Sequence, residues 1–408
     1  MQRAFKSATR HIELIWIVIF FIVFGLSSLL RVFTFAKEDI VLTTPIIILM
    51  FGAIFSGFFN KWKDLNIINR NKILDNDDRK FRKLAIFFLL AFLFWALFGC
   101  FRNIDQSYLI IGYVFSYFIL IISLIIAKPD SWPVMSLKAG FFFSLIFTVI
   151  ALIIWIEQGA SGRMTALMAP ASQAMIASCI IFCGFAIKSF SWRFAGIILA
   201  VFTVILCDSR TALLALIAAC TTIIIIKMKV QGRRKYFALK LFAISFAIVF
   251  CIVLLFWSES YHYISDWVAN VLSLYDPHRG IQAGFSSRTI VFRESYELFL
   301  SRPIFGWGFR ISENLLITSS SAHNGYLQTL VDVGLPGFLF AILCYLLATV
   351  RIYKRYQKRR SDIDLAFLAI LIFNAFFSIG ERYLFNVGNL LSILLIAAVC
   401  LPTAHKQL

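Results

Sequence analysis

The sequence predicts an all-α, polytopic integral membrane protein. Hydrophobic residues make up 61% of the 408-residue chain and charged residues 15%, whereas soluble domains have roughly 45 to 50% and about 25%. Apolar segments close to the ~20 residues that a helix needs to cross a bilayer recur from one end of the chain to the other. Lysine and arginine gather between alternate apolar segments, as they do in the cytoplasmic loops of membrane proteins.

About twelve segments have the length and composition of a membrane span. Several are short, so helix extension into the flanks or local thinning of the bilayer must make up the difference. The first lacks a small-residue cleavage site and is too long for a signal peptide, so we expect it to remain as the first span. The segments run approximately over residues 12–33, 41–59, 84–100, 109–127, 139–156, 174–188, 194–208, 210–226, 236–257, 335–350, 364–380 and 386–402.

The distribution of basic residues predicts the orientation. If both termini are cytoplasmic, the N-terminus, the loop 60–83 and the basic runs 227–235 and 351–360 all face the cytoplasm, as the positive-inside rule requires. Topology therefore explains the net charge of +18 and the pI of about 9.7. A nucleic-acid partner is not needed to account for them.

The cations left on the outer side are almost all arginines, although lysine is common on the cytoplasmic side. Arginine presents a planar fork that binds phosphate through two hydrogen bonds, and it stays charged under all relevant conditions. The excess of arginine on the outer side therefore predicts a phosphorylated ligand. The alternative is that these arginines simply pair with carboxylates on the same side. The outer cations are Arg31, Lys37, Arg102, Arg163, Arg210, Arg279, Arg288, Arg293, Arg302, Arg310 and Arg382.

The long outer segment 258–334 divides the chain into three parts. Residues 1–257 carry the first nine predicted spans, and residues 335–408 carry the last three spans and a cytoplasmic tail. A connection as long as 258–334 is uncommon unless it has a function. We therefore expect it to form a helical loop that carries the functional residues.

One amphipathic helix is predicted within this loop. Ser286 and Ser287 supply a cap before it, and Pro303 follows its end. Arg288 would lie in its first turn, where free backbone N–H groups favour an anion. Its apolar face would carry Phe292, Tyr296, Phe299 and Leu300.

Two neighbouring features have simpler explanations than ligand binding. Arg293 stands four residues before Glu297, the spacing of a helical ion pair. The sequence Pro303-Ile304-Phe305-Gly306-Trp307-Gly308 is typical of a turn with two apolar anchors.

His323 is the candidate catalytic residue. Ser321 or Asn324 can start a short helix here, and Gly334 can end it before Pro336 opens the next span. The positive end of the helix dipole disfavours imidazolium, so a neutral His323 can accept a proton near about pH 7. The other histidines have weaker contexts at the two chain ends, among aromatic residues and in a turn: His11, His405, His262 and His278.

Three short motifs carry a resemblance to a known family. They are Asp208-Ser209-Arg210-Thr211-Ala212-Leu213-Leu214-Ala215; Ser287-Arg288 with 303–308; and His323-Asn324-Gly325-Tyr326-Leu327 with Gly334-Leu335-Pro336-Gly337. In order, spacing and span pattern the chain resembles the O-antigen ligase and polymerase superfamily of bacterial envelope glycan transferases. The motifs themselves cover only the C-terminal half.

The resemblance implies a GT-C-like enzyme of the bacterial inner membrane, with its active site on the periplasmic face. Such enzymes move a glycan from undecaprenyl pyrophosphate to a hydroxyl of lipid A-core or of a second lipid-linked glycan. The matching motifs imply that Arg210 and Arg288 hold the donor pyrophosphate and that His323 serves the acceptor. Arg163, in Gly162-Arg163-Met164, is a weaker match for a third donor contact.

The residues suit single-displacement, inverting transfer without a metal or other cofactor. Two arginines can stabilise the leaving pyrophosphate, and a histidine can take the hydroxyl proton. The outer segments contain neither an Asp-x-Asp motif nor an obvious carboxylate pair. The expected partners are the lipid-linked donor, the lipid-borne acceptor and membrane lipid, with no nucleic acid.

Two alternatives remain open at this point. A polymerase of the same superfamily tends to carry two large arginine-bearing outer loops, whereas here only 258–334 is large and 157–173 is short, which favours a ligase. A lipid-linked oligosaccharide transporter fits less well, because the spans show no internal repeat and no ionisable group is expected near mid-membrane.

Overall fold

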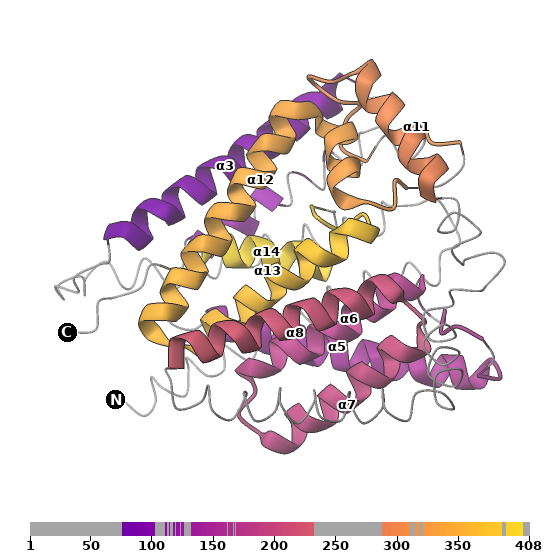
Figure 1. Ribbon diagram of the computed structural model, residues 1–408, viewed down its shortest axis with the longest axis vertical. Coiled ribbons are helices and arrows are strands. Elements are labelled where there is room, and N and C mark those ends of the chain that lie inside the picture. The colour runs from indigo at the N-terminus through magenta and orange to yellow at the C-terminus, as the bar shows by residue number, and fades with distance from the viewer. Residues whose placement is uncertain are drawn as a thin grey trace, which may run out of the picture.

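The computed structural model describes residues 76–102, 132–160, 162–165, 169–231, 288–310, 321–385 and 389–402, with isolated positions in 111–125, 167 and 315–317. These residues form helices and connecting turns (Figure 1). The helices are α3 (Asn76–Phe101), α5 (Trp132–Glu157), α6 (Pro170–Cys183), the short 3₁₀ helix η1 (Gly184–Ala186), α7 (Phe190–Leu206), α8 (Arg210–Gln231), α11 (Arg288–Ser301), α12 (Gly325–Arg359), α13 (Asp362–Gly380) and α14 (Leu390–Cys400).

Apolar helices occur at all eight predicted spans that lie within well-described stretches of the chain. Among the described residues, α3, α5, α8, α12 and α13 are long and apolar enough to cross a membrane, and α6, α7 and α14 are shorter apolar helices. The predicted span 109–127 is helical at its described positions. The predicted spans 12–33, 41–59 and 236–257 lie outside the described residues, so the number twelve stays a prediction.

Several helices extend beyond the boundaries expected from hydropathy, and α3 and α12 do so through charged residues. α3 begins at Asn76 rather than at 84, so the end of the predicted loop 60–83 is helical. α12 continues to Arg359, so nearly all of the basic run 351–360 is also helical. Lysine and arginine are good helix formers, and hydropathy detects only the apolar part of a helix that they continue.

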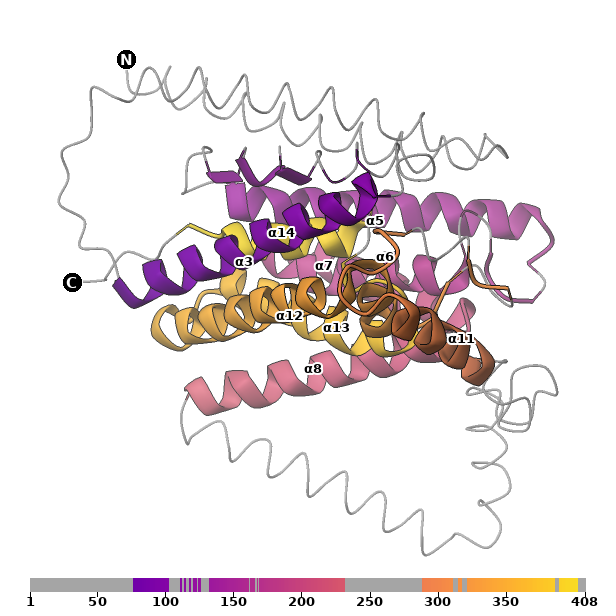
Figure 2. The same ribbon diagram turned by 90° about the horizontal axis from the view of Figure 1, so that it is seen from above.

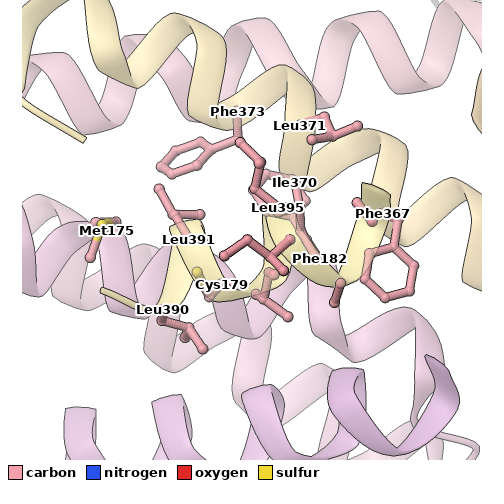
Figure 3. Close-up of a cluster of buried hydrophobic side chains, with 14 of the residues drawn as sticks. Met175, Cys179, Phe182, Phe367, Ile370, Leu371, Phe373, Leu390, Leu391 and Leu395 are labelled. Atoms are coloured by element: carbon pink, nitrogen blue, oxygen red, sulfur yellow. The ribbon is translucent and has the colours of Figure 1, made fainter. Parts of the chain in front are cut away.

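The long helices run side by side, and α11 lies at one end of the bundle in both views (Figures 1 and 2). α3 packs against α12, and α13 packs against α8, α12 and α14. α13 is the most deeply buried of the five candidate spans, as its nearly continuous apolar sequence requires. Figure 3 shows the core that it forms with α6 and α14, including Met175, Cys179, Phe182, Phe367, Ile370, Leu371, Phe373, Leu390, Leu391 and Leu395.

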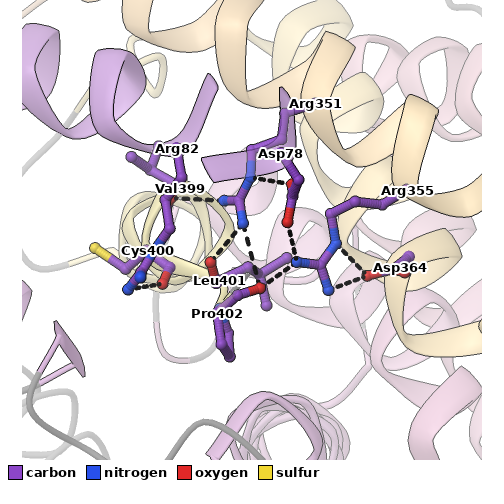
Figure 4. Close-up of polar contacts among 9 residues, drawn as sticks. All are labelled: Asp78, Arg82, Arg351, Arg355, Asp364, Val399, Cys400, Leu401 and Pro402. Carbon is purple, nitrogen blue, oxygen red and sulfur yellow. Dashed lines mark hydrogen bonds and ion pairs between the residues drawn. The ribbon is translucent and has the colours of Figure 1, made fainter. Parts of the chain in front are cut away.

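A buried ionic network joins several helices at one end of the bundle (Figure 4). Arg351 Nε donates to Asp78 Oδ1 at 2.7 Å, and Arg355 Nε donates to Asp364 Oδ1 at 3.1 Å. Arg351 also donates to the carbonyl oxygens of Val399, at 3.2 Å, and of Leu401, at 2.6 Å. The network thereby links α3, α12, α13 and the chain that leaves α14.

This network corrects one expectation about the basic run 351–360. The run was expected to lie in a cytoplasmic loop, but the Arg351 side chain is 1% exposed and that of Arg355 6%. Charges removed from water in this way need partners within the protein, and Asp78 and Asp364 supply them.

α12 changes direction at Gly334, as expected from the sequence. Gly334 has φ 68° and ψ −178°, a conformation that only glycine adopts without strain. A Cβ atom there would lie 2.2 Å from the carbonyl oxygen of Ile304. The turn 303–308 packs directly against this break, because Leu335 N donates to Pro303 O at 2.8 Å and Gly308 N donates to Asp332 O at 2.9 Å.

Candidate functional site

His323 immediately precedes the capped start of α12. The Asn324 side-chain oxygen accepts hydrogen bonds from the backbone N–H groups of Tyr326 and Leu327, each at 3.0 Å. Asn324, and not Ser321, is therefore the residue that starts this helix. His323 has φ 48°, in the left-handed region that histidine and asparagine tolerate better than most residues.

A chain of buried hydrogen bonds fixes the backbone on the other side of His323. The Ala322 N–H donates to Gln328 Oε1 at 3.0 Å, and Gln328 Nε2 donates to the two carboxylate oxygens of Asp332 at 3.2 and 3.3 Å. An ionised carboxylate only accepts hydrogen bonds, so Asp332 orients the Gln328 amide with its oxygen toward Ala322. The backbone of His323 is thus held from both sides.

The start of α12 approaches the end of α13 very closely. The Tyr326 hydroxyl donates to the carbonyl oxygen of Ala375 at 2.9 Å. A Cβ atom at Gly325 would lie 2.9 Å from Leu384 N and 3.0 Å from Glu381 O. Only glycine permits this approach, which brings His323 beside the chain that leaves α13.

Glu381 joins His323 to Arg288. Arg288 Nη2 donates to Glu381 Oε1 at 3.2 Å, while His323 Nδ1 lies 3.9 Å from Glu381 Oε2. The Glu381 side chain is 11% exposed, that of Arg288 29% and that of His323 36%. The Nδ1 atom itself is buried and has no hydrogen-bond partner among the described residues. A carboxylate thus lies between the predicted base and one of the predicted donor-binding arginines.

Sequence reasoning did not single out Glu381. It stands 58 residues after His323 and 93 after Arg288, so no short-range spacing connects the three. The available signal was its place directly after the apolar run 364–380, at the outer end of a predicted span. Many acidic residues share that kind of position, so only the folded structure distinguishes this one.

The start of α8 reaches the same end of α13. A Cβ atom at Gly380 would lie 2.7 Å from Thr211 Oγ1 and 3.2 Å from Arg288 Nη1. Arg210 is the first residue of α8 and directly precedes Thr211. The structure therefore brings the starts of α8, α11 and α12 together around Gly380 and Glu381.

Arg163 supports the chain just before α8. Its Nε donates to the carbonyl oxygen of Cys207 at 3.1 Å, and its Nη2 donates to that of Asp208 at 3.0 Å. Its Nε also lies 3.6 Å from the carboxylate of Asp208. Asp208 has φ 44°, and these contacts hold that strained corner two residues before Arg210. The predicted donor contact of Arg163 stays a prediction.

The helix predicted after Ser287 is present as α11, with Arg288 as its first residue. The predicted pair is also confirmed, because Arg293 Nε lies 3.0 Å from Glu297 Oε1. The predicted apolar face is wrong in part: Tyr296 and Leu300 are exposed, whereas Val291 and Ser295 are buried. The inward face is set by contact with α12, which the apolar spacing alone did not indicate.

Replacing Gly380 with alanine should reduce any activity of this site while leaving the bundle folded. The added methyl group must displace Thr211 and the Arg288 guanidinium, and misplacement by about 1 Å can lower a rate roughly 100-fold. Gly184→Ala is the matched control, since a Cβ atom there would meet its neighbours at ordinary contact distances of 3.5 Å or more. Equal loss in both variants, measured as turnover per folded protein, would contradict this role of Gly380.

Part of the chain is similar to a known protein family. Residues 195–342 match the family model described as O-antigen ligase. No curated protein gives a significant match to the chain. The matched segment runs from α7 to the first half of α12, and it includes Arg210, Arg288 and His323. The match supports the resemblance to the O-antigen ligase superfamily that the motifs predicted, over residues 195–342.

Proposed function

We propose that this protein is an O-antigen ligase-type glycosyltransferase. It moves a glycan from undecaprenyl pyrophosphate to a sugar hydroxyl of lipid A-core, with inversion at the anomeric carbon and without a metal ion. The observation that carries the proposal is that Arg288 and His323 lie beside different oxygens of the same carboxylate, that of Glu381. A guanidinium that can bind an anion and an imidazole that can accept a proton are thus separated by a single carboxylate group.

His323 acts as the general base in this proposal. Its Nδ1 is buried toward Glu381, which leaves Nε2 as the nitrogen for the acceptor hydroxyl. As the hydroxyl oxygen attacks the anomeric carbon, its proton passes to Nε2, and the bond from that carbon to the pyrophosphate oxygen breaks. The Glu381 carboxylate favours the imidazolium that forms, and a separation of 3.9 Å can shorten to a hydrogen bond when substrate binds.

Arg288 and Arg210 stabilise the departing pyrophosphate. Negative charge grows on the leaving group in the transition state, so a fixed guanidinium lowers the barrier more than it strengthens ground-state binding. Arg288 begins α11 and Arg210 begins α8, so each lies beside free backbone N–H groups that also favour an anion. Glu381 holds Arg288 in place until the donor arrives.

The site is assigned to the periplasmic side of the inner membrane. Asp364 in the ionic network and Glu381 in the site lie near opposite ends of α13, about 26 Å apart at 1.5 Å per residue. This is close to the ~30 Å thickness of a hydrocarbon core. The basic run in the last turns of α12 lies at the network end, and the positive-inside rule assigns that end to the cytoplasm.

Transfer by purified protein tests this function. The protein in detergent is mixed with undecaprenyl-pyrophosphate-linked glycan and lipid A-core, with and without chelator. We expect a new glycan–lipid A-core bond of inverted configuration in both reactions. A transporter would yield no covalent product, and activity that depends on an added divalent cation would contradict the metal-independent mechanism.

The lipopolysaccharide of a deletion strain tests the acceptor. Loss of all polymer from lipid A-core, with accumulation of lipid-linked polymer, is the result expected of a ligase. Core that carries a single repeat unit would instead identify a polymerase.

Lysine at position 210 or 288 should abolish most transfer although it preserves the charge. A lysine ammonium is a point charge and cannot reproduce the two-pronged grip of a guanidinium on phosphate. The initial rate of glycan transfer measures the effect, with Arg293→Lys as the control because Arg293 is exposed and paired with Glu297 on the same helix as Arg288. Near-normal turnover in both Arg210→Lys and Arg288→Lys would exclude the pyrophosphate clamp.

A further inference from the structure

Two polar side chains lie inside the apolar span α13 and have no part in the reaction described above. Between Leu365 and Ile379 the polar residues of this helix are Asn374 and Ser378, and both are fully buried. A polar group inside a membrane span costs free energy unless it has partners within the protein, and such groups commonly mark a functional site. A leucine would fill the position of Asn374 without that cost, so the amide calls for a specific role.

Asn374 holds the chain that leaves α13 back against the helix. Its Nδ2 donates to the carbonyl oxygen of Leu384 at 3.3 Å, and its Oδ1 accepts from Ser378 Oγ, also at 3.3 Å. Between the end of α13 and Leu384, the Tyr383 N–H donates to the carbonyl oxygen of Glu381 at 2.9 Å. The turn that carries Glu381 is therefore fixed at its far end by Asn374.

Tyr383 fixes the middle of the same turn. Its ring stacks on that of Phe377, with the ring centres 5.6 Å apart and an angle of 9° between the planes. Its hydroxyl shares a hydrogen bond with Ser172 Oγ, near the start of α6. Because Asn374 and Phe377 stand three residues apart on α13, they lie on one face of that helix, and the turn packs along this face.

The same turn contacts the start of the helix that follows His323. A Cβ atom at Gly325 would lie 2.9 Å from Leu384 N, 3.0 Å from Glu381 O and 3.0 Å from Ser378 Cβ. Gly325 stands two residues after His323. A shift of the turn therefore changes the position of the Glu381 carboxylate relative to the imidazole, whose Nδ1 lies 3.9 Å from Oε2.

We infer that Asn374 is a positioning residue for Glu381. Its hydrogen bond to Leu384 holds the turn so that the Glu381 carboxylate stays between Arg288 and His323. Asn374 stands six residues before the end of α13, about 9 Å along the helix axis, so it acts through the turn and not by contact with the reacting atoms. The inference rests on the proposed function, because it assigns to Asn374 a part in that reaction.

Amide hydrogen exchange of the purified full-length protein in detergent tests the hold of Asn374 on the turn. In Asn374→Leu the segment 381–385 should exchange roughly fivefold faster, the factor expected from the loss of one hydrogen bond. Asn374→Ala removes the same donor without the bulk of leucine and should give the same change. Ser378→Ala is the matched control, because it leaves the bond from Asn374 Nδ2 to Leu384 in place, and it should exchange as the wild type does.

Glycan transfer tests whether Asn374 acts through Glu381. Asn374→Leu should lower the initial rate roughly tenfold, since misplacement of a reacting group by about 1 Å can cost about 100-fold. When position 381 already carries glutamine, the same substitution should change the rate by no more than about twofold. A general loss of structure would lower the rate equally in both backgrounds.

Three results would overturn the inference. They are wild-type exchange of the segment 381–385 in both Asn374→Leu and Asn374→Ala, an equal loss of transfer with glutamate and with glutamine at position 381, and the same effects in Ser378→Ala. A wild-type protein that transfers no glycan would instead overturn the proposed function. The exchange experiment would then still decide whether Asn374 holds the turn.

Discussion

Asparagine in place of His323 should leave a folded protein that binds its lipid-linked donor but transfers glycan roughly 100 to 10,000 times more slowly, the range typical of a lost general base. Asparagine suits this test because it tolerates the positive φ of 48° at this position. The side-chain amide of asparagine cannot act as a base near neutral pH. His323→Ala should lose transfer as well, with additional backbone strain. Single-turnover transfer and donor binding are the two measurements that separate chemistry from binding.

Glu381→Gln provides the companion experiment. The amide preserves size but removes the negative charge that favours the imidazolium, so transfer should fall while donor binding persists. If Glu381 acts through His323, the double variant His323→Asn/Glu381→Gln should be no slower than His323→Asn alone. A slower double variant would show that Glu381 also works through Arg288. Wild-type rates in His323→Asn would remove His323 from the mechanism.

Asp78→Ala should lower the free energy of unfolding by about 3 to 5 kcal/mol, the cost typical of breaking a buried ion pair from one side. The Asp78 side chain is 5% exposed and accepts from Arg351 at 2.7 Å, with Arg355 Nη1 at 3.5 Å. Without it, the partners that remain to the buried Arg351 cation among the described residues are carbonyl oxygens of Val399, Leu401 and Pro402. Unfolding of the purified protein in detergent, followed by circular dichroism, measures the change.

The matched control is Asp77→Ala on the same turn of α3. Asp77 is exposed, and changes at exposed positions usually stay within about 0.5 kcal/mol. A similar loss in both variants would mean that the acidic start of α3 matters only through the helix dipole. Because the network lies at the far end of α13 from Glu381, transfer per folded molecule should be unchanged in Asp78→Ala.

Hydropathy located the described membrane helices because a helix that crosses a bilayer needs a long run of consecutive apolar residues. It placed the start of α3 and the end of α12 wrongly, since both helices continue through charged residues. It also assigned Arg351 and Arg355 to a loop. Their burial depends on Asp78 and Asp364, which lie elsewhere in the chain, and the sequence does not tell which carboxylate will meet which arginine.

Local features of the site were predictable for a similar reason. The start of α11 at Arg288, the Asn324 cap and the break at Gly334 follow from residues within a few positions of each other. The exposed side of α11 did not follow from its apolar spacing, because contact with α12 decides which face is buried.

The sequence by itself therefore determined the class of this protein, the described apolar helices and the identity of Arg210, Arg288 and His323 as candidates. These depend on composition, on local helix signals and on short motifs. Only the tertiary structure decided that Glu381 lies between Arg288 and His323, and that Gly380 and Gly325 let three helix starts approach the end of α13. Such contacts join residues tens of positions apart. Their distances depend on how the helices pack, which no local pattern records.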